Sequence, residues 1–268
     1  MVVVSRPVCL FAVVFVSGIS VSSGALADDG LFADFSINVG AFAFVGPAYE
    51  GSDEFRVTGV PVVFPSFGEN NERSRVTVRG ADDVRLSVLR RGGFDIGPIV
   101  GYSFGREESL SSKLDGLGDV EGGVVLGAFT SYTAGDFFVE TGISTQVTGV
   151  DDGGYLATAG FGYTAELAPR VSLTARTGLE YASDNYMDRY FSITDIQSAN
   201  SAQDYAAFDA SGGIKNVDVN LSLDFEATER LSLRASGGYS RLLGDAANSP
   251  ISESDNQLSG GLGFLFQF

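Results

Sequence analysis

The chain has 268 residues and a formal net charge of −17, from 34 acidic and 17 basic residues. It contains no histidine, which excludes Ser-His-Asp and Cys-His nucleophile systems and histidine-based acid–base catalysis. We therefore expect a protein that is not an enzyme. The acidic excess leaves no basic patch to meet phosphates, so nucleic acid is not an expected partner.

The first 27 residues have the pattern of a secretory signal peptide. Arg6 supplies a positive n-region, Val8–Val16 is an apolar h-region, and Ala25-Leu26-Ala27 fits a small-x-small cleavage site. The apolar run is too short for a membrane-spanning helix, which needs about 20 residues. The alternative is an ordinary N-terminal strand. Cleavage would remove the only cysteine, Cys9, and leave residues 28–268 as one domain with a net charge of −18 and no disulfide or thiolate metal site.

Thirty-five glycines and seven prolines are typical of an all-β chain with tight turns. The first strands are expected at 35–43 and 55–64, on either side of a turn-rich break at 46–53. Pro61 lacks an amide donor and indicates an edge strand or a bulge. After a polar turn at 67–73, two shorter pieces follow at 75–79 and 84–89. The pattern alone does not decide whether these two pieces are one bent strand or two strands.

The alternation of apolar and polar residues is more regular in the remaining chain. Strands are expected at 94–104, 124–132, 137–147, 155–163, 171–181, 217–227, 231–240 and 258–268. The longest irregular stretch lies at 183–213, and a longer loop is expected at 106–121.

The segment from Val217 to Ala227 alternates apolar and polar residues at every step, which indicates a strand with one dry and one wet face. A soluble sheet, such as a sandwich or a lipocalin-like binder, would give the same alternation. The length of the strands, the recurrence of the pattern and the terminal Phe268 favour lipid outside and water inside. The expected fold is an all-β, antiparallel, up-and-down transmembrane barrel in the outer membrane.

The expected turns at 134–136, 168–170 and 228–230 are very short, and the connections between them are longer, which is typical of periplasmic turns and external loops. Counting back from a periplasmic Phe268, the strand at 94–104 runs outward. If the N-terminus is also periplasmic, an even number of strands must precede this strand, so 75–79 and 84–89 are counted as two strands. Twelve strands result, and ten is the alternative. A partner in the periplasm would have to dock on the barrel rim or on residues 28–34.

In this arrangement several charged residues point into the lumen: Glu140, Glu166, Arg176, Glu180, Asp218, Asp224, Glu226 and Arg234. We expect a hydrogen-bonded, partly salt-bridged interior, because small barrels fill their interiors with side chains. The alternative is a narrow, cation-favouring solute path. The candidate interface girdle consists of Tyr102, Tyr132, Tyr155, Tyr163, Tyr181 and Tyr239.

Acidic pairs occur at Glu107-Glu108, Asp151-Asp152 and Asp82-Asp83. Two carboxylates can cleave glycosides, but pairs in glycine-rich turns are more often solvated. Asp151-Asp152-Gly153 lacks the spaced oxygen ligands of a calcium loop. We therefore assign no catalytic, cofactor-binding or metal-binding residue, and expect no cofactor.

Four segments resemble signatures of the MipA/OmpV family of outer-membrane proteins. They are Pro47-Ala48-Tyr49-Glu50-Gly51-Ser52-Asp53, Gly116-Leu117-Gly118-Asp119, Tyr186-Met187-Asp188-Arg189-Tyr190-Phe191 and Arg241-Leu242-Leu243-Gly244-Asp245-Ala246-Ala247-Asn248-Ser249-Pro250. The last is the most specific. Ser192 departs from the family, which usually has a glycine after the Tyr-Phe pair.

The resemblance covers essentially the whole chain after residue 27 and implies an outer-membrane barrel surrounded by lipid and lipopolysaccharide. It also implies a scaffold that brings a murein-cleaving lytic transglycosylase together with a murein synthase. The alternative function is a small-solute channel or permeability factor. The net negative charge of the protein would repel anionic lipopolysaccharide unless divalent cations or outward-pointing Lys and Arg side chains lie between them.

Overall fold

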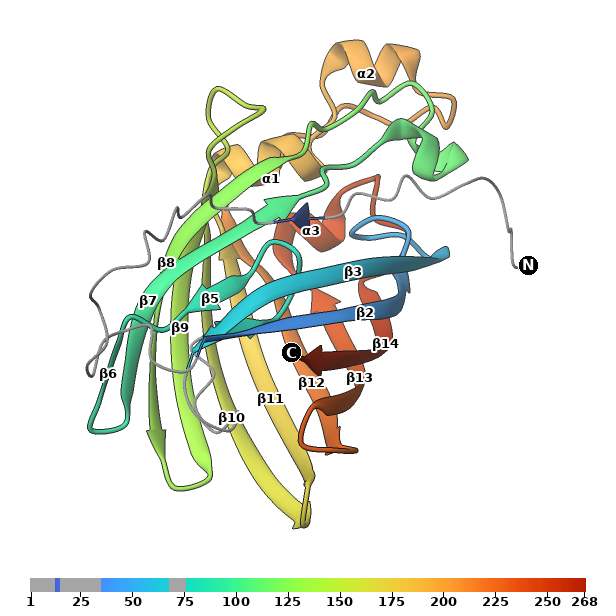
Figure 1. Cartoon of the computed structure of the whole chain (residues 1–268). Helices are drawn as coiled ribbons and strands as arrows, with labels where there is room; N and C mark the ends of the chain where they lie inside the picture. Colours follow the sequence, from blue (N-terminus) through green and yellow to red (C-terminus); the bar gives the residue numbers. More distant parts are fainter. Residues whose placement is uncertain (1–12, 15–34, 68–75) are drawn as a thin grey trace, which may run out of the picture.

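The structure is a computed structural model that describes residues 13–14, 35–67 and 76–268 (Figure 1). The expected cleavage site, residues 28–34 and most of the expected turn at 67–73 lie outside the described residues. Within the expected signal peptide, only Val13 and Val14 are described, and they pair in parallel with Val62 and Val63. No described helix is long and apolar enough to cross a membrane.

Antiparallel strands make up most of the described chain. The strands are β1 (Val13–Val14), β2 (Phe35–Pro47), β3 (Phe55–Phe67), β4 (Val76–Val78), β5 (Val84–Leu86), β6 (Leu89–Arg91), β7 (Phe94–Ser103), β8 (Gly123–Ala134), β9 (Phe137–Gln146), β10 (Leu156–Ala168), β11 (Val171–Ala182), β12 (Gly213–Glu226), β13 (Leu231–Leu242) and β14 (Asn256–Gln267). The helices are α1 (Asp184–Phe191), α2 (Asp195–Asn200), α3 (Gly244–Asn248) and the short 3₁₀ turns Glu108–Leu110 and Ser112–Leu114.

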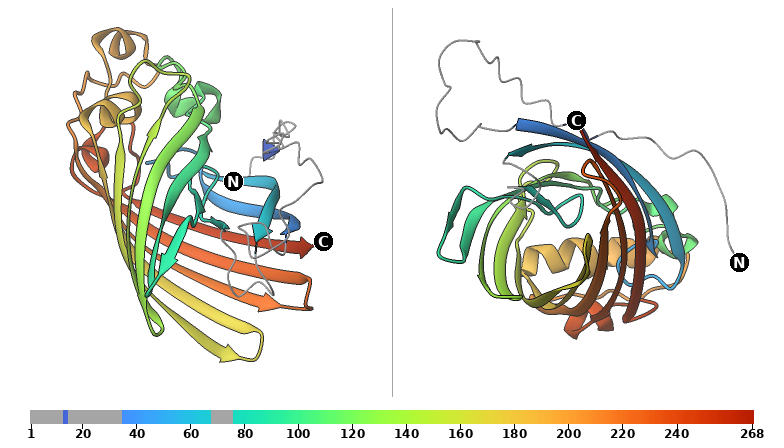
Figure 2. Two further views of the ribbon diagram at one scale, coloured as in Figure 1. Left: turned by 60° about the vertical axis from the view of Figure 1, so that its left-hand side comes forward. Right: turned by 60° about the horizontal axis from the view of Figure 1, so that its bottom comes forward.

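Twelve of these strands form one curled sheet. Its order is β3-β2-β14-β13-β12-β11-β10-β9-β8-β7-β5-β4, so the last strand pairs with the first strand of the barrel. Every pair in this order is antiparallel, and the sheet wraps around a central space as a half-barrel (Figure 2). In the described chain, no ladder joins β3 to β4. The expected up-and-down architecture of about twelve strands is confirmed.

The two short pieces before residue 90 are separate strands, β4 and β5, as the strand count required. β6 continues the line of β5 along β7 after a register shift of one residue, since Arg85 pairs with Ile99 but Leu89 with Ile96. β3 is the terminal strand of the twelve-stranded order, and Pro61 pairs with Ala41 of β2 without the local irregularity expected there in a closed barrel.

The expected division into an apolar outer and a polar inner face is confirmed in β12. Val219, Leu221, Leu223 and Phe225 are 38–49% exposed. They alternate with Asp218, Asn220, Ser222 and Asp224, which therefore lie on the opposite face. Because such a row of large apolar side chains is stable in hydrocarbon and costly in water, this is the lipid-facing surface.

The connections differ at the two ends of the sheet. At one end the strands are joined by short turns at 92–93, 135–136, 169–170 and 227–230, and we call this the turn end. Gly92 and Gly93 have φ values of 59° and 86°, as a two-residue hairpin turn requires. The long connections that the structure describes and all three α-helices lie at the opposite, loop end (Figure 1).

The outward face of β12 gives a direct test. We expect Leu221→Lys to destabilise the barrel by about 2–4 kcal/mol, the cost of a basic side chain on the lipid face near the middle of the bilayer. Ser222→Lys is the matched control, because its side chain points to the polar interior. Urea unfolding in lipid vesicles measures both. Equal stability of the two variants would contradict the assigned faces.

Candidate functional site

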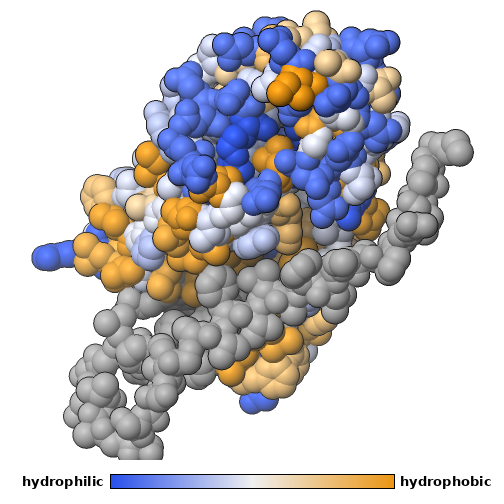
Figure 3. All heavy atoms as spheres, turned by 90° about the horizontal axis from the view of Figure 1, so that it is seen from above, coloured by the Kyte–Doolittle hydropathy of each residue, from blue (hydrophilic) through white to orange (hydrophobic). Residues whose placement is uncertain are grey.

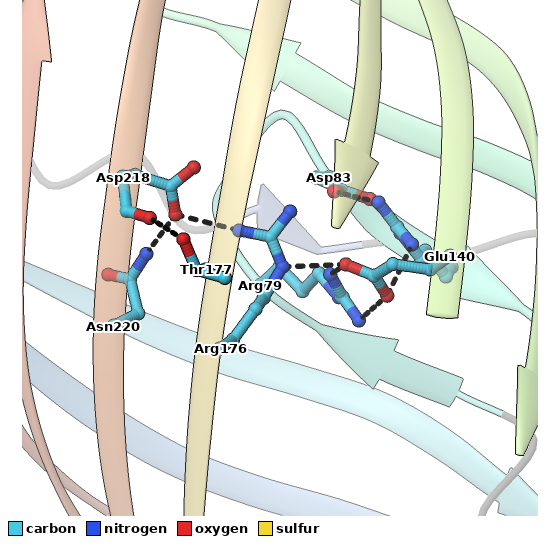
Figure 4. A network of polar contacts seen from close by, with 8 residues as sticks. Arg79, Asp83, Glu140, Arg176, Thr177, Asp218 and Asn220 are labelled. Atoms are coloured by element: carbon cyan, nitrogen blue, oxygen red, sulfur yellow. Dashed lines mark hydrogen bonds and ion pairs between the residues drawn. The ribbon is translucent and has the colours of Figure 1, made fainter. Parts of the chain in front are cut away.

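The centre of the lumen holds a network of ion pairs around Glu140 on β9 (Figure 4). The Glu140 side chain is only 2% exposed and contacts three arginines. Arg79 binds it through both terminal nitrogens. Arg176 Nε lies 2.6 Å from Oε1, and Arg85 Nη1 lies 3.3 Å from Oε2. A carboxylate with this many partners is held in one position.

Arg176 reaches Glu140 by crossing β10, the strand that lies between their own two strands. It passes over Gly160, where an added Cβ would lie 2.8 Å from Arg176 Nη2. On its other side, Arg176 Nη1 lies 2.7 Å from Asp218 Oδ1 on β12. The glycine leaves the space that allows one guanidinium to join β9, β11 and β12.

The other two arginines come from the β4–β5 hairpin. The backbone of Asp82 in its turn packs against Gly101 on β7, and Tyr102 N donates to Ala81 O at 2.8 Å. Arg85 lies over the Phe129 ring at 5.3 Å and also binds Asp83 at 2.8 Å. The ion pairs of the central network therefore also hold the hairpin against the inner wall.

The predicted lumen residues fall into three groups. Glu140, Arg176 and Asp218 belong to the central network. Asp224 and Arg234 form a separate pair at 2.6 Å, nearer the turn end. Glu180 binds Lys215 at 2.6 Å. Glu166 and Glu226 lie close to the turns and are exposed.

The sequence analysis missed three basic residues of the interior. Arg85 sits between two apolar residues, so strict alternation would have placed it inward. Arg79 lies in a turn, where alternation gives no direction. Lys215, which is 4% exposed at its side chain, binds both Glu180 and Glu50 (2.7 Å). The register shifts between β11 and β12 beside it, so a bulge breaks the alternation there.

A folded cap closes the loop end, made of residues 47–54, 104–122, 183–212 and 243–255. It contains two clusters of buried apolar side chains. The first is built from Ala182, Met187, Phe191, Ala210, Leu242 and Ala246. The second is built from Tyr49, Leu114, Leu117, Ile193 and Ile251. Each of the four signature segments places at least one side chain in these clusters, although the segments are far apart in the sequence.

Hydrogen bonds join the segments of the cap. Tyr49 Oη donates to Ile251 O at 3.2 Å, and Ser249 Oγ donates to Phe191 O at 2.6 Å. Ser192 is buried, and its Oγ accepts from Ala210 N at 2.8 Å. Its φ of −78° suits any residue, so the serine that departs from the family pattern is accommodated without strain and adds a contact.

A cavity of about 190 Å³ lies at the base of the cap. It is lined by residues that follow β2 and β7 and by α1, among them Tyr49, Glu50, Ser103, Arg106, Tyr186 and Tyr190. Burial raises the pKa of Tyr186 well above its usual value and also raises the pKa of Tyr49, so both phenols stay protonated. Burial lowers the pKa of Arg106 from its ordinary value.

At least one member of each acidic pair has a partner in the structure. Asp83 binds Arg85, Glu108 accepts from Gly116 N, and Asp152 accepts from Gly154 N at 2.9 Å. Asp83, Glu108 and Asp152 therefore make contacts within the protein, whereas solvated turn residues were expected. Among the described residues, no group of three or more acidic side chains is placed to hold a metal ion.

The six tyrosines of the expected girdle are 36–42% exposed. Tyr102, Tyr155, Tyr181 and Tyr239 lie near the loop end and Tyr132 near the turn end, whereas Tyr163 lies in the middle of β10. Seen from the loop end, the cap is largely hydrophilic at its surface, whereas apolar residues gather on the flank below it (Figure 3). Water-facing cap and lipid-facing wall are thus clearly separated.

An apolar outer wall and a charged interior define a β-barrel of the outer membrane. The family described as MltA-interacting protein MipA matches residues 39–268. The chain belongs to this family, and the resemblance seen in its sequence is confirmed.

Two curated relatives are named for the same location. Outer membrane protein Omp26La of Vibrio anguillarum is 24% identical, and outer membrane protein OmpV of Vibrio cholerae serotype O1 is 23% identical. Each alignment spans 170 residues, 63% of this chain and 64% of the relative, so less than two thirds of either relative is matched. Among solved structures, the NanC porin is 10% identical with a TM-score of 0.41, covering 88% of this chain and all of that one.

The central network predicts a large effect of neutralising Glu140. Glu140→Gln leaves three arginines without their shared carboxylate, and we expect a loss of about 3–5 kcal/mol in unfolding free energy. Glu166→Gln, exposed on the same face, should change it by less than about 0.5 kcal/mol. Urea unfolding of the refolded barrel measures both. If the two variants were equally stable, the network would have no role in stability.

The cap should have a stability of its own. Phe191 is fully buried in the first cluster, so Phe191→Ala should weaken the cap by about 3–5 kcal/mol. Ile196→Ala, 74% exposed on α2, is the control. We expect proteolysis to cut residues 183–212 faster in the first variant only, while heat-modifiable gel mobility reports an intact barrel in both. Unchanged proteolysis of the Phe191 variant would contradict the cluster.

Proposed function

We propose that residues 1–27 are removed on export and that residues 28–268 form a non-enzymatic barrel that brings murein-processing enzymes together. The description of the family, MltA-interacting protein, supports this role. So does the absence of histidine from the chain, which removes the commonest acid–base group.

The observation that carries the proposal is the ion-pair network of the interior. Arg79, Arg85, Glu140, Arg176 and Asp218 bind one another along the inner wall, and the cap lies over the loop end. Side chains that satisfy each other in this way stabilise a wall rather than a path. The surfaces that remain for function are the two rims of the barrel.

The rim at the turn end is the expected site of docking, because short turns face the periplasm in barrels of this kind. A stable interface buries roughly 1,000 Å² or more. A single turn of two to four residues is too small to bury this area. The partner would therefore span several turns together, with residues 28–34 as the natural addition.

The second candidate is a narrow solute path, and the charged lumen favours it. The expected preference for cations does not follow from the described residues, however. At the centre of the network, Arg79, Arg85 and Arg176 face Glu140, Asp83 and Asp218. These charges balance, so a path through them would show little selectivity by sign.

Single-cysteine variants test the scaffold, because the chain after residue 27 has no cysteine of its own. Asp136→Cys and Glu229→Cys label exposed turns, and Ile196→Cys labels the cap. After crosslinking in isolated envelopes, we expect mass spectrometry to find a murein transglycosylase or synthase on the turn variants and not on the cap variant. The intact mass of the purified protein reports whether its first residue is Asp28.

Two results would overturn the scaffold. One is the absence of murein enzymes from both turn variants when gel mobility shows that the barrels are folded. The other is the same yield of these enzymes from Ile196→Cys. If the first result came with ion-conducting steps from pure protein in planar bilayers, the solute path would replace the scaffold.

A further inference from the structure

Arg106 is the only buried basic residue of the described chain that lacks a carboxylate partner. It is 4% exposed. Arg85 and Lys215, which are equally buried, each bind two acidic residues. Arg106 Nη1 donates to Tyr190 O at 2.6 Å, and Nε has no hydrogen-bond partner among the described residues. A buried cation without a counter-ion is costly, which makes this position exceptional.

The backbone holds Arg106 in place. Its N–H donates to Val120 O at 2.9 Å, and its C=O accepts from Val120 N at 2.8 Å, which extends the β7–β8 hairpin beyond the sheet. The side chain therefore enters the cavity at the base of the cap from a fixed point.

The rest of the cavity supplies an aromatic wall. The rings of Tyr186 and Tyr190 stack with centroids 4.6 Å apart and planes at 27°. Tyr190 Oη and Ser103 Oγ lie 3.2 Å apart. Glu50, which also lines the cavity, is already bound to Lys215. Lys215 also binds Glu180, and among the described residues neither glutamate forms an ion pair with Arg106.

From these contacts we propose that the cavity binds a small organic anion: one ring that packs beside Tyr186 and Tyr190, and one carboxylate that pairs with Arg106. A carboxylate is the group that a guanidinium binds best through paired N–H donors. The volume of the cavity limits the size of the ligand. An engineered cavity of about 150 Å³ holds benzene, so about 190 Å³ accommodates one ring with its carboxylate. The site is independent of the proposed scaffold function.

Two sources share this chemistry, an aromatic acid and an acidic monosaccharide. Benzoate and glucuronate are the probes, and benzamide is the neutral analogue of the first. Calorimetry on the full barrel in detergent should show saturable binding of at least one acid, with a Kd of about 1 mM or tighter. Benzamide should bind at least tenfold more weakly than benzoate. The acid that binds more tightly identifies the source.

Arg106→Met removes the charge at similar length and should weaken binding of the acid at least tenfold. Arg189→Gln is the control, because this neighbouring arginine lies 5.3 Å from the Tyr190 ring and belongs to the cap but does not line the cavity. Its binding should equal that of the unchanged protein. Gel mobility checks that both variants fold.

Three results would overturn the proposal: no saturable binding of either acid, equal binding of benzoate and benzamide, or undiminished binding by folded Arg106→Met. If Arg106→Met does not fold, the first two comparisons still decide, since they use the unchanged protein.

Discussion

Lipid on one face of the sheet is the constraint on which the rest of the structure depends. The row Val219, Leu221, Leu223 and Phe225 faces outward, and the period of two then sends every second residue of β12 inward. Charges that enter the interior in this way lie far from bulk water and must find partners. Glu140, with three arginines, is the clearest result.

The same constraint places the packed apolar core in the loops. In the described strands, most large apolar side chains face lipid, and the lumen is polar. Water is excluded by protein packing alone mainly in the cap, where Phe191, Leu114 and Ile251 are almost fully buried. This explains why the signature segments lie mostly outside the strands. Their buried side chains pack against each other over long sequence distances, and each depends on the others.

How much the sequence predicts follows from how local each signal is. The alternation predicted the faces of β12, because period two is a property of one strand, but the strand begins at Gly213, four residues before the expected start at Val217. The bulge beside Lys215 depends on the neighbouring strand and was missed. The start of helix α2 could have been predicted from the sequence, because Thr194 and Gln197 form a capping box. The cavity around Arg106 could not be predicted, because its wall comes from three distant segments.

The cap also connects parts of the chain on the two sides of the gap between β3 and β4. Since no ladder joins β3 to β4 in the described residues, the two edges of the half-barrel need another connection. Tyr49 follows β2 on one side of this gap, and Leu114 follows β7 on the other. Both pack in the second cluster with Ile251, and Tyr49 also binds the Ile251 carbonyl. Apolar packing in the cap thus links segments that follow β2 and β7, and the cavity lies where these segments meet.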